Sequence, residues 1–441
     1  MNALRFAGRC CPIFVACALG AVTAGAAPPA GNAALEYWKA VALLREPRTA
    51  EQLTYAEYVE NTLPGLQPAI FNARPAVYRW VLSDLPSLQA VIRADRIGEC
   101  DFQLRQPGRP EAELNHLPRL RQLCRRIGGL NLALEFAGRP AEAAAGYAGL
   151  LNLLCRLDQD ATLASNLAAA DLMQDVLSAL EGFISRAPGP EALDILLNAA
   201  RRRTKPLISP GRALRRESAW LSKELARTPD LMAFLQRWRG RDRLGEMMDA
   251  YLQAQGLTDA RAKKWLAEYR AAAGELADAL EQPFAQGWPI LQRLDAERDR
   301  QRNEPEIGTN PLPLLLLPSG AELYERMFLA NAQADLAALL CAAASAREKD
   351  GRWPADLEAA AKVLERPAPL DPFSGQPMTY QVARGRLTMG VRIPRRMEER
   401  GTWLYTISPE SRFRADEQRT REAIGRARVI EATELFEPVG R

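Results

Sequence analysis

The fold of this chain is decided most clearly by residues 118–158, PRLRQLCRRIGGLNLALEFAGRPAEAAAGYAGLLNLLCRLD. Apolar side chains recur there at helical spacing on both sides of a central turn, which predicts two amphipathic helices. They are Leu123, Ile127, Leu130 and Leu134 before the turn, and Tyr147, Leu150, Leu151 and Leu154 after it. Gly138 suits the position that follows a helix, and Pro140 suits the first turn of the next one. The stretch therefore predicts an antiparallel pair of helices.

The turn of this hairpin, residues 138–143, reads Gly-Arg-Pro-Ala-Glu-Ala and is similar to the turn of a tetratricopeptide repeat. An array of such repeats requires the pattern to recur about every 34 residues. Because the chain shows no recurrence at that period, we interpret residues 118–158 as a single helical hairpin.

Helical periodicity extends from the hairpin in both directions. The further segments cover residues 51–61, 84–97, 161–186, 190–203, 211–227, 242–255, 258–281 and 284–300. Asn32 is a suitable N-cap for one more helix, which carries Leu35, Trp38, Ala42 and Leu43 on one side. Strand-like alternation is scarce before residue 375, so this part of the chain is predicted to be an array of helices.

The last quarter of the chain has a different pattern. A long apolar-periodic helix follows Gly320 and ends near Lys349, where Gly351 can adopt the left-handed conformation that terminates a helix. A short helix is predicted over residues 355–364. Strands are predicted over residues 378–382 and 402–407, where apolar and polar residues alternate.

Between the short helix and the first strand lies a predicted structural turn. It is formed by Asp371, Pro372, Gly375, Pro377 and Tyr380. Asp371 can accept hydrogen bonds from turn amides, Pro372 fixes φ, and Gly375 can adopt a positive φ. We expect these residues to have a structural role and not to bind a ligand.

This arrangement resembles the soluble part of type II secretion major pseudopilins. In those proteins a long helix leads through a Gly-Arg-Tyr-Pro-like turn and a short helix to an Asp-Pro-Trp-Gly-x-Pro-Tyr-like turn and a small sheet. The matching residues here are 351–354, Gly-Arg-Trp-Pro, and 371–377, Asp-Pro-Phe-Ser-Gly-Gln-Pro. Residues 311–392 also resemble the C-terminal end of uncharacterised exported bacterial proteins, whose helical halves carry segments similar to residues 99–102 and 117–120. The resemblance implies a small α+β fold and brings no established activity.

Two departures limit what this resemblance implies. No apolar helix of the filament-forming kind precedes Ala321, so no filament is expected. Residues 408–411, Ser-Pro-Glu-Ser, lack the cluster of oxygen ligands that a Ca²⁺ site requires, so no metal is expected there.

The domain organisation follows from these patterns, because 441 residues exceed what one compact core usually holds. We expect a mainly α chain, with an N-terminal multi-helix array and a small C-terminal α+β pseudopilin-like unit. The expected parts are a signal peptide over 1–26, a helical domain over 27–304, a Pro-rich linker over 305–320, the pseudopilin-like unit over 321–413 and a charged tail over 414–441.

The N-terminus has the features of an export signal. Arg5 and Arg9 precede an apolar stretch over residues 10–22, and Ala24-Gly25-Ala26 supplies small side chains for a signal peptidase. Cleavage after residue 26 predicts a periplasmic or secreted protein. A lipoprotein signal at Cys17 and an uncleaved membrane anchor are the alternatives, and no later segment is predicted to cross a membrane.

Four cysteines follow the signal: Cys100, Cys124, Cys155 and Cys341. Cys124 and Cys155 lie at nearly equal distances from the hairpin turn, which permits a disulfide if their Cα atoms approach within about 7 Å. The alternative is that both are small buried hydrophobic residues.

The sequence supplies little catalytic chemistry. His116 is the single histidine, and zinc-binding, phosphate-binding, dinucleotide-binding and Ser-nucleophile motifs are all lacking. A thiol nucleophile would need His116 beside Cys100 or Cys124; a histidine at a helix start is the simpler interpretation. We therefore predict no catalytic residue, no cofactor and no metal.

Charge also limits the partners. The formal net charge is +4, and removing residues 1–26 lowers it to +2, which predicts no nucleic-acid partner. The basic cluster formed by Arg201, Arg202, Arg203, Lys205, Arg212, Arg215 and Arg216 permits peripheral contact with a membrane, or forms a solvated helix end and loop.

These patterns lead to three hypotheses for function. The first is a non-enzymatic exported protein with a structural or protein-interaction role in the cell envelope and an unknown protein partner. The second is a cell-envelope hydrolase that uses paired carboxylates. The third is an accessory of a secretion or pilus-like system.

Overall fold

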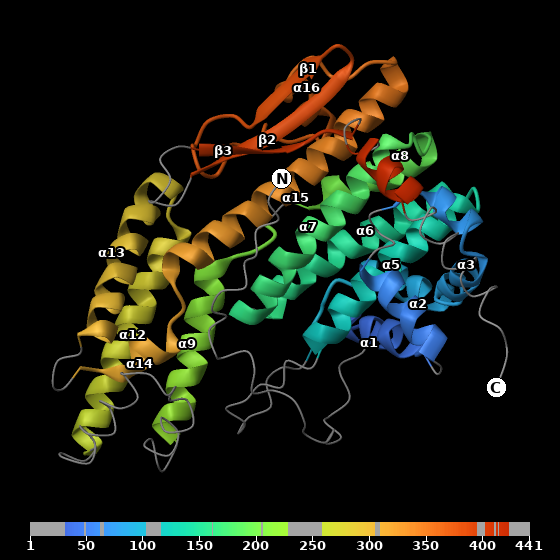
Figure 1. Cartoon of the computed structure of the whole chain (residues 1–441). Coiled ribbons are helices and arrows are strands. Elements are labelled where there is room, and N and C mark those ends of the chain that lie inside the picture. Colours follow the sequence, from blue (N-terminus) through green and yellow to red (C-terminus); the bar gives the residue numbers. More distant parts are fainter. Residues whose placement is uncertain are drawn as a thin grey trace.

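The computed structural model describes residues 31–47, 50–61, 66–102, 116–160, 162–203, 206–227, 258–304, 309–394, 402–409, 412 and 414–422. This part of the chain is mainly helical, with a small antiparallel sheet near its C-terminus, as predicted (Figure 1). The predicted signal peptide and the predicted helix over 242–255 lie outside the described residues.

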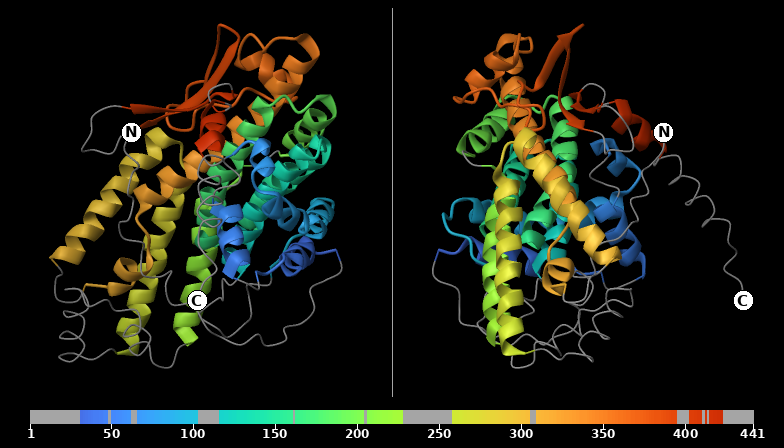
Figure 2. Two further views of the ribbon diagram at one scale, coloured as in Figure 1. Left: turned by 45° about the vertical axis from the view of Figure 1, so that its right-hand side comes forward. Right: turned by 90° about the vertical axis from the view of Figure 1, so that its left-hand side faces the viewer.

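The described residues up to 304 are mainly helical. The helices are α1 (Ala33–Leu43), α2 (Ala50–Asn61), α3 (Pro75–Leu82), α4 (Leu85–Asp95), α5 (His116–Phe136), α6 (Pro140–Leu157), α7 (Leu163–Ser185), α8 (Pro190–Arg202), α9 (Pro210–Arg227), α12 (Asp259–Glu281) and α13 (Phe284–Asn303). Two 3₁₀ turns, η3 (Pro68–Asn72) and η4 (Asp158–Asp160), lie among them. Figure 2 shows α9, α12 and α13 running side by side as one layer of the molecule.

Within the described residues between 309 and 407, three helices are followed by three strands. They are α14 (Pro311–Leu316), α15 (Gly320–Asp350), α16 (Leu357–Val363), β1 (Thr379–Ala383), β2 (Arg386–Pro394) and β3 (Thr402–Ile407). Helix α14 falls within the predicted Pro-rich linker, where Asn310 caps its first turn by accepting a hydrogen bond from the amide of Leu312 (3.0 Å).

The predicted hairpin is formed by α5 and α6, which pack against each other and against α7. Gly138 follows α5 with a φ of +71°, and Pro140 is the first residue of α6, as the sequence predicts. Gly351 ends α15 with a φ of +70°, and this prediction is also confirmed.

Helix α1 begins after Asn32, whose side chain accepts a hydrogen bond from the amide of Ala34 (3.0 Å), as predicted. The apolar side predicted for this helix is wrong. Leu35 and Trp38 are 41% and 38% exposed, whereas Tyr37 is fully buried. Tyr37 stacks on Phe102 (ring centroids 6.1 Å apart), so an aromatic contact far along the chain determines which face turns inward.

The sheet has the order β1-β2-β3, with both pairs antiparallel. Its central strand β2 was not predicted from the sequence. Residues Leu387, Met389, Val391 and Ile393 alternate along it and are fully buried. Arg384 and Gly385 form the two-residue turn before β2, with φ values of +51° and +74°. An Arg-Gly pair is a weaker hairpin signal than Asn-Gly or Asp-Gly, although both central residues adopt the positive φ that such a turn requires.

Helix α15 connects the sheet to the helical body. It packs along α7 and α8, contacts α13 near its start, and contacts α16 and β2 near its end. The side chain of Asp295 on α13 accepts hydrogen bonds from the amides of Gly320 (2.9 Å) and Ala321 (2.8 Å), which fixes the start of α15. An anionic side chain at this position also interacts favourably with the helix dipole.

One stretch of the described chain, Pro311–Asp350, is long and apolar enough by length and composition to cross a membrane. This corrects the prediction that no such segment follows the signal. Because 78% of its most apolar window is buried inside the protein, the stretch has the surroundings of a core helix.

The basic cluster predicted at the end of α8 and the start of α9 pairs with other parts of the chain. Arg202 lies 2.8 Å from a carboxylate oxygen of Asp95, and Arg201 donates to the backbone oxygen of Val363 (2.8 Å). The remaining pairs are Arg203 with Asp335, Arg212 with Asp158, and Arg215 with Asp278 and Glu281. These arginines therefore hold separate helices together. Lys205 lies outside the described residues.

A buried ion pair joins three parts of the N-terminal half. Arg126 on α5 and Asp84, just before α4, are both inaccessible to solvent, and two guanidinium nitrogens of Arg126 donate to the same carboxylate oxygen. The second oxygen of Asp84 accepts from the amide of Arg45 (3.1 Å), and the guanidinium lies over the ring of Trp80 (3.8 Å). Burial raises the pKa of Asp84, although Arg126 acts in the opposite direction.

We expect Arg126→Ala to lower the free energy of unfolding by about 3–5 kcal/mol at pH 7, because it leaves a carboxylate buried without its partner. This decrease in the free energy of unfolding should be smaller at lower pH. Once the Asp84 carboxyl is protonated, burying it without a cation no longer destabilises the folded state. Arg121→Ala on the same helix is the control, since Arg121 forms an exposed pair with Asp171 and should contribute less than about 1 kcal/mol. Urea unfolding at pH 5 and pH 7 measures both variants, and equal effects for the two would contradict the expectation.

Gly287 lies where α13 approaches α12 closely. A Cβ at this position would lie 2.4 Å from the backbone oxygen of Ala279, so Gly287→Ala should destabilise the protein by about 1–3 kcal/mol. Gly274 on α12 has open space around the same position, and Gly274→Ala should stabilise the protein by about 0.5–1 kcal/mol through helix propensity. Thermal unfolding of the two variants should give shifts of opposite sign; a shift of the same sign would contradict this account of the α12–α13 contact.

Candidate functional site

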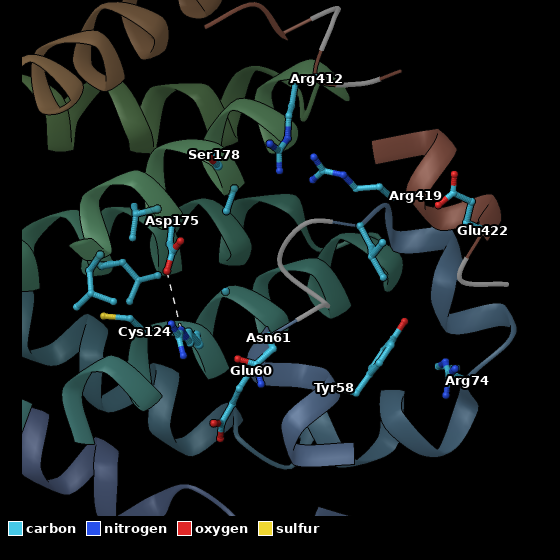
Figure 3. Close-up of a pocket in the computed structure, with 17 residues that line it drawn as sticks. Tyr58, Glu60, Asn61, Arg74, Cys124, Asp175, Ser178, Arg412, Arg419 and Glu422 are labelled. Atoms are coloured by element: carbon cyan, nitrogen blue, oxygen red, sulfur yellow. Dashed lines mark ion pairs between the residues drawn. The ribbon is translucent and has the colours of Figure 1, made fainter. Parts of the chain in front are cut away.

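The candidate site is a cavity of about 670 Å³ between the N-terminal helices and the C-terminal segment. We define the C-terminal segment as residues 408–409, 412 and 414–422. Helix α2 lines the cavity on one side, α5 and α7 on another, and the C-terminal segment closes it (Figure 3). A cavity of this volume lies within the range of small-ligand sites.

Small and apolar residues line the part of the cavity between α5, α6 and α7. They are Gly128, Leu150, Leu172, Val176 and Ala179. Their side chains belong to the facing surfaces of the helical hairpin and α7, so the fold itself forms this apolar part of the site.

Arginines line much of the remaining surface. Arg412 and Arg419 come from the C-terminal segment, Arg125 comes from α5, and Arg74 lies just before α3. Figure 3 shows the side chains of Arg412 and Arg419 directed toward each other over the cavity, whereas Tyr58 lies apart from them, beside Arg74. Four arginines and three acidic residues, Glu60, Asp175 and Glu422, line the cavity.

Arg412 and Arg419 are held by Asp416, whose side chain is only 2% exposed. The Nε of Arg412 lies 2.9 Å from one carboxylate oxygen of Asp416, and a guanidinium nitrogen of Arg419 lies 3.8 Å from the same oxygen. Arg186, directly after α7, lies 3.9 Å from the other oxygen and donates two hydrogen bonds to Glu135 on α5 (2.6 and 2.9 Å). Burial raises the pKa values of Glu135 and Asp416, whereas the surrounding arginines act in the opposite direction.

The backbone also attaches the C-terminal segment to the N-terminal half. The amide of Gln67 donates to the hydroxyl of Thr420 (2.8 Å), across 353 residues of sequence. The amide of Ser408 donates to the carboxylate of Glu181 on α7. In Figure 1 the helical part of the segment, drawn in red, lies over the N-terminal helices. These contacts bring Arg412 and Arg419 to the cavity.

Tyr58 and Arg74 form a second pair at the cavity. The guanidinium of Arg74 lies over the Tyr58 ring, 4.5 Å from its centroid. Burial raises the pKa of Tyr58, so its hydroxyl is protonated at neutral pH and can donate a hydrogen bond. The hydroxyl makes no hydrogen bond of normal geometry within the described part of the chain.

The acidic side of the cavity is formed by Asp175 and Glu60. Asp175 on α7 lies 3.9 Å from the Nε of Arg125, and burial raises the pKa of its carboxyl. Glu60 on α2 accepts a hydrogen bond from the side chain of Gln122 (2.9 Å). The cavity therefore presents both hydrogen-bond acceptors and cations to a ligand.

The thiol that lines this cavity is unsuited to nucleophilic chemistry. Burial raises the pKa of Cys124 to about 12, which keeps the thiol protonated at neutral pH. His116 does not line the cavity, and its ring stacks on Phe102 with centroids 5.1 Å apart. Cys124 and Cys155, between which the sequence permits a disulfide, are free thiols in the structure.

The structural turn predicted from the sequence lies away from the cavity. The carboxylate of Asp371 accepts from the amides of Phe373 (3.0 Å) and Arg392 (2.9 Å), and Gly375 has a φ of +68°. The backbone oxygen of Asp371 accepts from the amide of Gly375 (2.8 Å). The hydroxyl of Tyr380 donates to the backbone oxygen of Pro354 (3.0 Å). Pro372 follows Asp371 in the turn, and Pro377 pairs with Leu370 in an isolated β-bridge. Asp371 thus joins its own turn to β2.

Among the residues that the structure describes, no group of three or more His, Cys, Asp or Glu side chains could hold a metal ion. Sequence reasoning missed the cationic residues of the cavity: it placed Arg412 in the pseudopilin-like unit and Arg419 in the charged tail, and it gave neither a role. The spacing of Arg412, Asp416 and Arg419 places all three on one helical face, and this was the available signal. No family model, no curated protein and no solved structure matches the chain.

We expect Asp416→Asn to loosen the C-terminal segment, because Arg412, Arg419 and Arg186 lose the buried anion between them. Hydrogen exchange of the amides in residues 414–422 should become severalfold faster. Glu417→Gln is the matched control, since Glu417 is the next residue and pairs only at the surface with Arg421. Unchanged exchange in Asp416→Asn, or equal acceleration in both variants, would contradict the role of Asp416.

Proposed function

We propose that the chain is an exported, non-enzymatic protein of the bacterial cell envelope that binds a protein partner at the cavity described above. The observation that carries this proposal is the placement of Arg412 and Arg419 at the cavity by the buried Asp416. Arginines positioned in this way beside an apolar surface are a common feature of protein recognition sites.

The C-terminal unit supports a related proposal, that residues 321–413 are pseudopilin-like. A long helix, a Gly351 turn, a short helix, the Asp371 turn and an antiparallel sheet follow one another in the order that the resemblance implies. An accessory role in a secretion or pilus-like assembly is compatible with this unit. The motifs concern fold, however, and fold alone does not determine function.

A hydrolase with paired carboxylates is the second candidate. The observation in its favour is that Glu60 and Asp175 both line the cavity and that burial raises the pKa of Asp175. Against it, Arg125 lies 3.9 Å from Asp175, and a nearby cation favours the charged form over the protonated form that a general acid needs. We therefore place binding ahead of hydrolysis.

A photo-crosslinking amino acid at Ser178, which lines the cavity, tests the proposed function. The full-length precursor is expressed in the bacterial cell, and we expect crosslinking to a discrete envelope protein in the periplasmic fraction. The control carries the crosslinker at Arg139, which lies on the exposed turn between α5 and α6 and pairs with Glu142. Absence of a crosslinked protein at Ser178, or the same products at both positions, would overturn the proposal.

A further inference from the structure

The two arginines of the C-terminal segment have unused hydrogen-bonding capacity. Within the described part of the chain, the ion pairs of Arg412 and Arg419 are those with Asp416. A guanidinium has five N–H donors. The contacts to Asp416 run from the Nε of Arg412 (2.9 Å) and from the Nη1 of Arg419 (3.8 Å). The remaining donors can bind an anion without breaking the contacts that position the side chains.

The charge balance around Asp416 favours an additional anion. Arg186, Arg412 and Arg419 face Asp416, and Arg186 also pairs with Glu135. This cluster holds three cations and two carboxylates. An anion bound between Arg412 and Arg419 would neutralise it.

The acidic residues of the cavity determine which anion fits. Asp175 and Glu60 accept hydrogen bonds and would repel a phosphate dianion, but they can accept from peptide N–H groups. The apolar residues Leu150, Leu172 and Val176 suit an aliphatic side chain. A peptide supplies all three groups together, with a carboxylate, amide donors and an apolar side chain in one short segment.

We propose that the cavity binds an acidic peptide segment, with a ligand carboxylate held by Arg412 and Arg419 and a neighbouring aliphatic side chain on the apolar surface. This inference rests on the proposed function and names the part of the partner that enters the cavity. The guanidinium groups provide the charge-assisted hydrogen bonds that carboxylates form most strongly.

The test uses the full chain after export and two fluorescent hexapeptides, acetyl-Ala-Leu-Glu-Leu-Glu-Ala-amide and its analogue with Gln in place of both Glu residues. We expect the acidic peptide to bind at least ~10-fold more tightly than the analogue, which corresponds to the ~1.4 kcal/mol expected at minimum for a lost charge-assisted hydrogen bond. Arg412→Gln combined with Arg419→Gln should abolish that difference. Arg139→Gln, on an exposed turn, is the control and should leave the difference unchanged.

Several outcomes would overturn the proposal. The first is equal affinity for the two peptides, and the second is no effect of the double arginine variant. The third is displacement of the acidic peptide by millimolar inorganic phosphate, with the peptide binding no more tightly than phosphate does. Hydrogen exchange of residues 414–422 in the double variant shows whether the segment is still in place; if it is displaced, the affinities of the unaltered chain for the two peptides decide the question. If crosslinking at Ser178 has the same yield in the double arginine variant, the proposed function stands and the acidic-peptide proposal is rejected. Failure of this proposal can therefore be distinguished from failure of the proposed function.

Discussion

The structure depends on the burial of one helix. Helix α15 is apolar or small around most of its circumference, and a helix of this kind must be enclosed on all sides. The enclosing elements come from both sides of α15 in the sequence. Helices α7 and α8 pack along it, α13 contacts it near the start of α15, and α16 and β2 contact it near the end of α15. The buried residues of the helical array and of the C-terminal unit therefore belong to one continuous core.

The sequence predicted helices well where glycine, proline and capping residues mark their ends. The hairpin of α5 and α6, with Gly138 and Pro140 between them, is the clearest case. The central strand β2 was missed because its turn, Arg384-Gly385, lacks the usual residue types, although the alternation over residues 387–393 was visible. The prediction of the buried face of α1 was also wrong. Which face of a helix turns inward depends on tertiary partners, such as Phe102 for this helix.

Much less of the candidate site than of the fold could be predicted from the sequence. Its residues come from α2, α5, α7 and the C-terminal segment, and no local motif relates segments that are more than 350 residues apart. Residues such as Arg125 and Asp175 look like ordinary surface charges in the sequence. The structural turn around Asp371 differs in this respect, since its hydrogen bonds are mostly local and its residue types indicate its conformation.

The contact between Gln67 and Thr420 has a consequence for biogenesis. A chain is synthesised amino end first, so its helical body emerges long before the C-terminal segment. The body can begin to fold, but Arg412 and Arg419 line the cavity only once residues 414–422 are present. A polypeptide that ended before these residues could therefore fold in part while its cavity lacked one wall.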